Sequence, residues 1–123
     1  MDLSRFKLIE VADQVGDLIW NEVNEWDWFN KETIGRQLVR AVDSISANLS
    51  EAYGRFSFRE RKRFSYYARG SLCETINWTN KAIRRGLIEV EQGTIILNKL
   101  TEVSYKINYY IRSLKKQLPD SQS

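Results

Sequence analysis

Two lines of polar residues lie beside the apolar positions in the middle of the chain, and their side chains could do chemistry. The first line has helical spacings of three and four residues, and its members are Gln37, Arg40, Ser44, Asn48 and Glu51. The second line places a hydroxyl and a carboxylate in the same manner, at Ser71 and Glu74. Such side chains could form a binding groove, a catalytic pair of carboxylates or a hydrogen-bonded network that fixes the register between helices.

The two carboxylates, Glu51 and Glu74, are too far apart in the expected helical hairpin to act together. With a turn near residues 54–57, antiparallel pairing places Arg40 opposite Ser71 and within reach of Glu74. Glu51 and Glu74 are then several helical turns apart, far beyond the separation that two-carboxylate catalysis uses. No histidine is present to move protons near neutral pH. We therefore favour a structural network over catalysis, and expect it to be buried or interfacial and to include Arg40, Ser44, Ser71 and Glu74.

A basic segment follows the expected turn. Residues 55–69 read RFSFRERKRFSYYAR, in which basic and aromatic side chains alternate around a single acid, Glu60. Cations meet phosphates and rings stack on bases, so this mixture suits nucleic acid without strong sequence preference. Arginines in the first turns of a helix oppose its dipole, so helix stability does not explain them. The candidate nucleic-acid-binding residues are Arg55, Arg59, Arg61, Lys62 and Arg63, and the alternatives are pairing with acids of a neighbouring subunit or plain exposure to solvent.

The composition excludes several classes of enzyme. The 123-residue chain has one cysteine and no histidine, which excludes a disulfide framework, the usual zinc sites and Ser-His or Cys-His catalytic pairs. No cofactor, metal or small-molecule substrate is implied, and we expect no enzyme. The lone thiol, Cys73, is expected in the core or at an interface. No apolar run is long enough to span a membrane and the N-terminus lacks a signal-peptide core, so we expect a cytoplasmic protein with no membrane partner.

Charge is distributed unevenly along the chain. Residues 1–32 hold three basic and eight acidic side chains, whereas residues 33–88 hold eleven basic and four acidic ones. A subunit with one acidic and one basic surface favours head-to-tail contacts, which can close into a ring. Aromatic residues outside the apolar lines would supply the apolar part of this oligomer interface, and they are Trp20, Trp78, Tyr105 and Tyr109.

Four helical segments are expected to position these side chains, because apolar residues recur every three or four positions in four stretches. The stretches run from Leu8 to Trp26, from Ile34 to Ala52, from Phe64 to Ile83 and from Ile96 to Leu118. Ser57 and Glu60 have the spacing of a capping box, and Gly86 stands where a helix-ending glycine belongs. The predicted fold class is all-α, an antiparallel up-down-up-down four-helix bundle. It forms one domain over residues 1–118, followed by a polar tail over 119–123.

The chain resembles the bacterial four-helix-bundle proteins known as 23S rRNA-intervening sequence proteins. The resemblance is most specific over residues 37–88, where QLVRAVDSISANLSEAYGR precedes RERKRFSYYARGSLCETINW and a Gly-Leu-Ile step. The first part of the family motif is matched by Gln37, Arg40, Ala41, Ser44, Ile45, Asn48 and Glu51, and the second part by Gly70, Ser71 and Glu74. Ala52 stands where the family usually has glycine, which affects only the local turn geometry.

The resemblance implies a four-helix bundle that assembles as a homopentamer and has no established enzymatic activity. The family name records that some members are encoded within insertions in rRNA genes, and it states no molecular role. A related fold serves retroelement reverse transcriptases as a basic accessory pentamer, with a proposed role in binding nucleic acid and the transcriptase. We therefore expect a self-assembling, non-enzymatic scaffold or adaptor, with RNA or DNA binding through the basic segment as the alternative.

Overall fold

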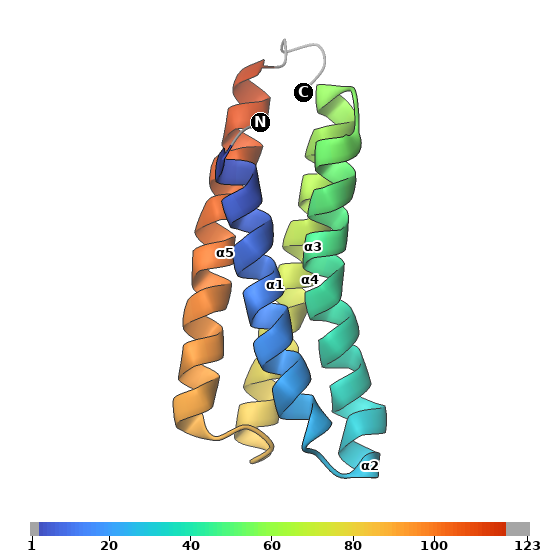
Figure 1. Ribbon diagram of the computed structural model, residues 1–123, viewed down its shortest axis with the longest axis vertical. Coiled ribbons are helices and arrows are strands. Elements are labelled where there is room, and N and C mark those ends of the chain that lie inside the picture. Colours follow the sequence, from blue (N-terminus) through green and yellow to red (C-terminus); the bar gives the residue numbers. More distant parts are fainter. Residues whose placement is uncertain (1–2, 118–123) are drawn as a thin grey trace.

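The computed structural model describes residues 3–117, which form a bundle of four long helices (Figure 1). Helix α1 spans Leu3–Asn24, α3 spans Arg36–Gly54, α4 spans Phe58–Arg84 and α5 spans Val90–Gln117. A short helix α2 (Trp28–Asn30) and a π-helical turn η1 (Lys31–Gly35) precede α3 and extend it. This part of the chain contains no strand. The predicted all-α four-helix bundle is confirmed, while Leu118 and the predicted tail over 119–123 lie outside the described residues.

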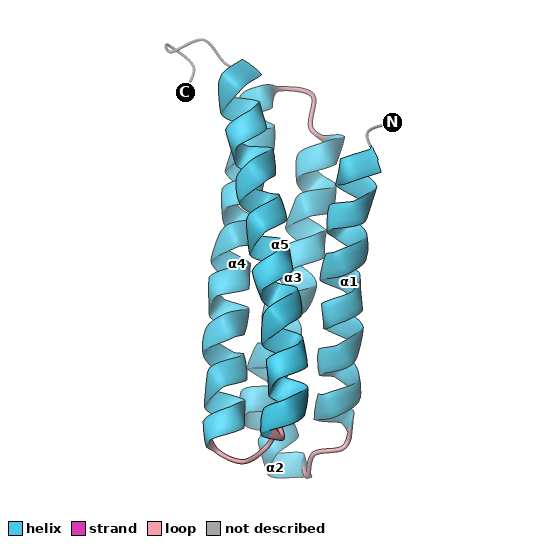
Figure 2. Cartoon of the chain, turned by 90° about the vertical axis from the view of Figure 1, so that its left-hand side faces the viewer, coloured by secondary structure: helices cyan, strands magenta, loops and turns pink. Residues whose placement is uncertain are grey.

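Each long helix packs antiparallel against the next, and α5 closes the bundle by packing against α1 (Figure 2). Helices α1 and α4 therefore occupy diagonally opposite corners of the bundle. The turn between α3 and α4 lies at the same end as the start of α1 and the end of α5, which we call the hairpin end (Figure 1). The α1–α2 and α4–α5 connections lie at the opposite end.

The two diagonal helices carry charge of opposite sign. Helix α1 has four acidic and two basic side chains, whereas α4 has seven basic and two acidic ones. The bundle is thus acidic at one corner and basic at the corner across from it. Among the described helices, none combines the length and the apolarity needed to cross a membrane.

The core consists mainly of the predicted apolar lines of α1, α3 and α5. The largest fully buried side chains include Leu8, Ile19, Leu38, Ile45, Leu49, Leu72, Ile96, Leu100, Ile107 and Leu114. Burying one such side chain contributes about 1.5–3 kcal/mol relative to exposing it. Because these residues recur every three or four positions, one face of each helix turns inward and the polar lines are left at the sides and outside.

Helix α4 departs from its predicted apolar line. Three residues of the predicted line, Phe64, Ile76 and Ile83, are only partly buried. Ser65 and Thr75, which lie outside that line, are buried, while Thr79 is buried as predicted. The Ser65 and Thr75 hydroxyls each donate a 2.7 Å hydrogen bond, to the carbonyl oxygens of Arg61 and Ser71. These bonds within the helix let the two hydroxyls be buried with their hydrogen bonds satisfied. Cys73 is exposed, so it does not belong to the core, and its predicted place at an interface stays a prediction.

Both predicted ends of α4 are confirmed by their capping contacts. The Ser57 hydroxyl accepts a 3.1 Å hydrogen bond from the backbone N–H of Glu60. Gly86 has a φ of +76°, in the left-handed region that side chains disfavour. These two residues fix where α4 begins and where the chain turns toward α5.

Candidate functional site

Between α3 and α4, the structure brings three of the predicted polar residues together. The Ser71 hydroxyl donates a 3.0 Å hydrogen bond to Ser44 Oγ. Asn48 Nδ2 donates to the Ser44 carbonyl oxygen at 2.9 Å and to Ser44 Oγ at 3.0 Å. All three side chains are half-buried. This short network links α3 to α4 in one register, as the structural interpretation of the polar lines expects.

The other members of the predicted network stay at the surface of the subunit, and they are Gln37, Arg40, Glu51 and Glu74. Within the described part of the chain, neither Arg40 nor Glu74 forms an ion pair. The register also differs from the expected one by a helical turn, because Ser71 meets Ser44 rather than Arg40. A network of Arg40 and Glu74 buried within the subunit is therefore wrong, and their role between subunits stays a prediction.

At the hairpin end, two of the five candidate nucleic-acid-binding residues are held by ion pairs within the subunit. Arg55 pairs with Glu51 at 3.1 Å, and Arg63 pairs with Glu60 at 2.7 Å. Their guanidinium groups lie 4.8 and 5.2 Å from the centroid of the same ring, that of Phe64. Exposed ion pairs contribute only about 0–1 kcal/mol, so a phosphate can take the place of either carboxylate.

The remaining candidates differ in their surroundings. Arg61 donates from Nε to the Arg55 carbonyl oxygen at 2.7 Å and lies 5.4 Å from the centroid of Phe58, so it braces the turn. Lys62 is half-buried. Arg59 is exposed and makes no ion pair with another described residue. Three residues earlier in the sequence, the side chain of Phe56 is fully exposed at the turn.

A second basic cluster lies between α4 and α5. Tyr66 and Arg69 belong to the predicted basic segment, although not to its five candidate residues, and Lys115 lies outside that segment. The Arg69 guanidinium lies 4.6 Å from the centroid of Tyr66 and donates a 3.2 Å hydrogen bond to Asn108 Oδ1. Lys115 Nζ lies 5.7 Å from the centroid of the same ring. The pKa of Tyr66 is lowered, first by a hydrogen bond from Lys115 and then by the charges of Lys115, Arg69 and Lys62, although burial opposes this.

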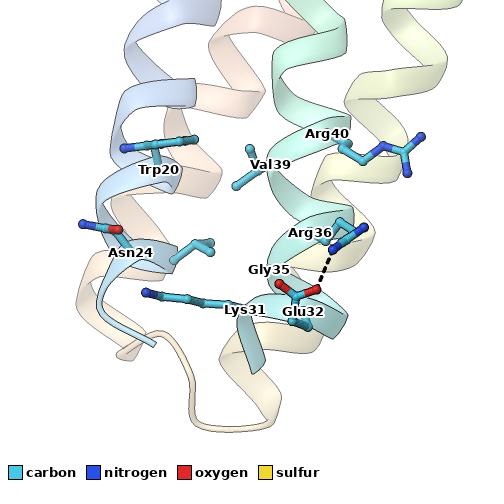
Figure 3. A pocket seen from close by; sticks show the side chains of 9 residues that line it. Trp20, Asn24, Lys31, Glu32, Gly35, Arg36, Val39 and Arg40 are labelled. Carbon is cyan, nitrogen blue, oxygen red and sulfur yellow. Dashed lines mark hydrogen bonds and ion pairs between the residues drawn. The ribbon is translucent and has the colours of Figure 1, made fainter. Parts of the chain in front are cut away.

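An apolar groove lies between α1 and the start of α3, toward the opposite end of the bundle (Figure 3). It encloses about 340 Å³, and its lining includes Trp20, Val23, Val39, Lys31, Glu32, Arg36 and Arg40. Val39 points toward Trp20, whereas Arg40 extends away from it, and the Arg36–Glu32 ion pair lies at the rim (Figure 3). The groove thus offers an apolar centre with charged edges, which is the usual composition of a protein interface.

The four predicted interface aromatics lie on three different helices. On α5, Tyr105 and Tyr109 are 74% and 65% exposed. On α1, Trp20 is 59% exposed at the groove. On α4, Trp78 is half-buried, and its indole N–H has no hydrogen-bond partner among the described residues. The candidates are therefore spread over the bundle, and their place at an oligomer interface stays a prediction.

Acidic side chains crowd the contact between α1 and α3. Burial raises the pKa of Asp43, and the negative charges of Asp13 and Asp17 raise it further. This repulsion opposes folding whenever the carboxylates are ionised. Over the described part of the chain, no group of three or more His, Cys, Asp or Glu side chains is arranged to hold a metal ion.

Comparisons with known proteins agree with the fold. A family model described as 23S rRNA-intervening sequence protein matches residues 5–109. No curated protein matches the chain. The crystal structure of a protein of unknown function from the S23 ribosomal protein family of Bacteroides thetaiotaomicron is similar, with a TM-score of 0.80 and 23% identity over 89% of this chain and 98% of that one. At this identity, the structural likeness supports the fold alone.

Proposed function

Because the chain belongs to the 23S rRNA-intervening sequence protein family, we propose that it is a non-enzymatic, self-assembling helical module, a scaffold or adaptor in the cytoplasm. The observation that carries this proposal is the exposure of large rings on helix faces, namely Trp20 at 59%, Tyr105 at 74% and Tyr109 at 65%. Aromatic anchors of this kind dominate the energetics of protein interfaces.

Charge supports a head-to-tail arrangement of the subunits. The acidic helix α1 and the basic helix α4 lie at diagonal corners, so the acidic corner of one subunit can face the basic corner of the next. Contacts between unlike surfaces close into a ring or continue as a filament, and only a ring gives a particle of defined size. The family resemblance favours five subunits, a number that the charges do not determine.

Light scattering on a sizing column tests the assembly. We expect a mass that is a multiple of 14.5 kDa, with five subunits favoured, and a mass near 14.5 kDa would refute assembly. An even-numbered particle built on twofold contacts would refute the head-to-tail arrangement. Trp20→Ser should weaken assembly about tenfold or more if the groove is an interface. Trp28→Ser is the control, because Trp28 is 75% exposed and lies outside the groove lining.

A specific observation favours a second function, the binding of RNA or DNA at the hairpin end. The fully exposed ring of Phe56 stands at the turn next to Arg55 and close in sequence to Arg59. An exposed ring beside cations is the combination that binds single-stranded nucleic acid by stacking and by phosphate contacts. The ion pairs of Arg55 with the exposed Glu51 and of Arg63 with the half-buried Glu60 lie at the surface, so these carboxylates are weak competitors for those phosphates.

Titration of mixed-sequence RNA and DNA tests this second function. The variant changes five residues to Gln, namely Arg55, Arg59, Arg61, Lys62 and Arg63. We expect this variant to bind more weakly than the wild type and to show a shallower dependence of affinity on salt. Arg84→Gln with Arg85→Gln is the control at the opposite end of α4. Equal affinity of the five-residue variant, or no binding by the wild type at low salt, would remove the hypothesis.

A further inference from the structure

We propose that Arg69 and Lys115, which meet around Tyr66 between α4 and α5, form a phosphate-binding site separate from the turn residues. The identification of its ligand as a backbone phosphate rests on the proposed nucleic-acid function, whereas the site itself rests on geometry and charge. The groups converge from two helices that lie side by side (Figure 2). The guanidinium of Arg69 and the ammonium of Lys115 lie 4.6 and 5.7 Å from the ring centroid of Tyr66, and Lys115 is hydrogen-bonded to the Tyr66 hydroxyl, so an anion at this ring can reach all three groups.

Arg69 and Tyr66 are held in position before any ligand binds, whereas Lys115 is exposed. The Arg69 guanidinium lies 4.6 Å from the centroid of Tyr66 and is fixed from the other helix by its 3.2 Å hydrogen bond to Asn108. Both Arg69 and Tyr66 are half-buried, which limits their rotamers. A guanidinium that is already oriented loses less conformational freedom when it binds an oxyanion. Asn108 is neutral, so this bond orients Arg69 without cancelling its charge.

Among the described residues, no neighbouring acid balances the positive charge of the cluster. Over the part of the chain whose side chains are described, neither Arg69 nor Lys115 forms an ion pair with a carboxylate. From Val103 to Gln117, α5 carries four basic side chains and no acidic one. On α4, Glu60 is already paired with Arg63 at 2.7 Å. Cations held together without a counter-ion repel one another, so an anion at this point relieves repulsion as well as making new contacts.

The chemistry of the cluster favours phosphate over a carboxylate. The planar fork of Arg69 can donate two parallel hydrogen bonds to one oxyanion. Lys115 and the Tyr66 hydroxyl can donate to further oxygens from other directions. A phosphate presents its oxygens in a tetrahedron and can accept from donors that approach from different directions, whereas the two oxygens of a carboxylate lie in one plane. The sequence shows none of this, because Tyr66 and Lys115 come together only through the pairing of α4 with α5.

The first arm of the test uses inorganic phosphate and the ionisation of Tyr66 as the readout. A phosphate bound beside the hydroxyl adds negative charge, so it should raise the pKa of Tyr66, measured by phenolate absorbance. Tyr66→Phe identifies which tyrosine gives the signal. Chloride at equal ionic strength measures screening alone, and the same rise with chloride as with phosphate would overturn the site. The paired variant Arg69→Gln with Lys115→Gln should lose the phosphate-specific rise.

The second arm uses a mixed-sequence single-stranded RNA. The same paired variant should bind this RNA about tenfold more weakly than the wild type. The slope of log affinity against log salt concentration should become shallower by about one unit for each phosphate that the variant no longer binds. Arg84→Gln with Arg85→Gln removes the same number of charges away from the cluster and should bind like the wild type. Arg69→Lys keeps the charge but loses the fork, so it should bind with intermediate affinity. Circular dichroism and light scattering establish that each variant is folded and equally assembled.

The two arms separate failure of the site from failure of the nucleic-acid function. If phosphate raises the pKa of Tyr66 and the wild type binds no RNA, the site is supported and its ligand is a free phosphate rather than a nucleic acid. If the wild type binds RNA and the paired variant binds it equally well, the site is overturned and the nucleic-acid function stands.

Discussion

Ser71 on α4 donates a 3.0 Å hydrogen bond to Ser44 on α3, and this contact sets how the two helices align. The bond is short enough and buried enough to resist replacement by water. Asn48 completes it from the next turn of α3 by donating to the Ser44 hydroxyl at 3.0 Å. A half-buried polar contact of this kind favours one register, because a slip by one turn would leave the hydroxyls without partners.

We expect Ser44→Ala and Ser71→Ala each to lower the free energy of unfolding by about 0.5–1.5 kcal/mol. The double variant should lose less than the sum of the two, since both single changes break the same bond. Urea denaturation of all four proteins gives this coupling. Ser50→Ala is the control on an exposed turn of α3, with an expected change within about 0.5 kcal/mol. Fully additive losses would show that the serine pair is not a unit.

Apolar spacing predicted the parts of the fold that large aliphatic residues determine. The lines of α1, α3 and α5 are buried as expected, because Leu, Ile and Val gain most by leaving water. The capping box at Ser57 and the left-handed Gly86 could also be predicted, since each depends on a few neighbouring residues. Local patterns therefore carried the fold class and the ends of α4.

Features that depend on contacts between helices could not be predicted in the same way. Ser65 and Thr75 look like surface residues, and only their bonds to carbonyls one turn back make burial acceptable. The cluster at Tyr66 needs the register of α4 against α5, which places Lys115 beside it. The expected pairing of α3 with α4 is wrong by one helical turn, and an error of this size assigns every residue of one helix to the wrong partner on the other.

Glu74→Ala tests whether the exposed polar residues of α3 and α4 act between subunits. Glu74 has no ion-pair partner among the described residues of its own subunit, so the stability of an isolated subunit should change by less than about 0.5 kcal/mol. If Arg40 of one subunit and Glu74 of another join at the interface, removing the carboxylate should weaken assembly by about 2 kcal/mol or more. Light scattering over a range of concentrations measures this. Unchanged thermal stability and unchanged assembly together would rule out the network between subunits.

Asp43→Asn should stabilise the protein at neutral pH and have no effect in acid. The pKa of Asp43 is raised by burial and by Asp13 and Asp17, so its ionisation opposes folding. That opposition is absent below the ordinary carboxyl pKa and becomes complete as the pH rises through the raised value. We expect a gain of at most about 1 kcal/mol at pH 7, reduced by high salt.

Thermal unfolding from acid to neutral pH checks the effect of Asp43→Asn. Glu102→Gln serves as the control, because it removes one exposed carboxylate from α5. The pKa of Glu22 is raised by burial and then by Glu89. Ionisation of Glu22 therefore also lowers the stability as the pH rises, and it does so equally in both variants. A gain that persists below the ordinary carboxyl pKa would contradict the electrostatic explanation.

Two glycines should respond in opposite directions when a methyl group is added. At Gly93, near the start of α5, a new Cβ would collide with Cδ1 of Ile83 and lie 2.6 Å from its Cγ1, so Ile83 on α4 would have to move. Overpacking of this kind costs about 1–3 kcal/mol, and Gly93→Ala should be destabilising.

At Gly70, in the middle of α4, a Cβ would meet nothing within 4 Å. Gly70→Ala should therefore stabilise the bundle by about 0.5–1 kcal/mol through helix propensity alone. Urea denaturation measures both, and Ile83→Val in the Gly93→Ala background should recover part of the loss by making room. A loss at Gly70 without any change in assembly would mean that this outer face of α4 is packed against something within the subunit.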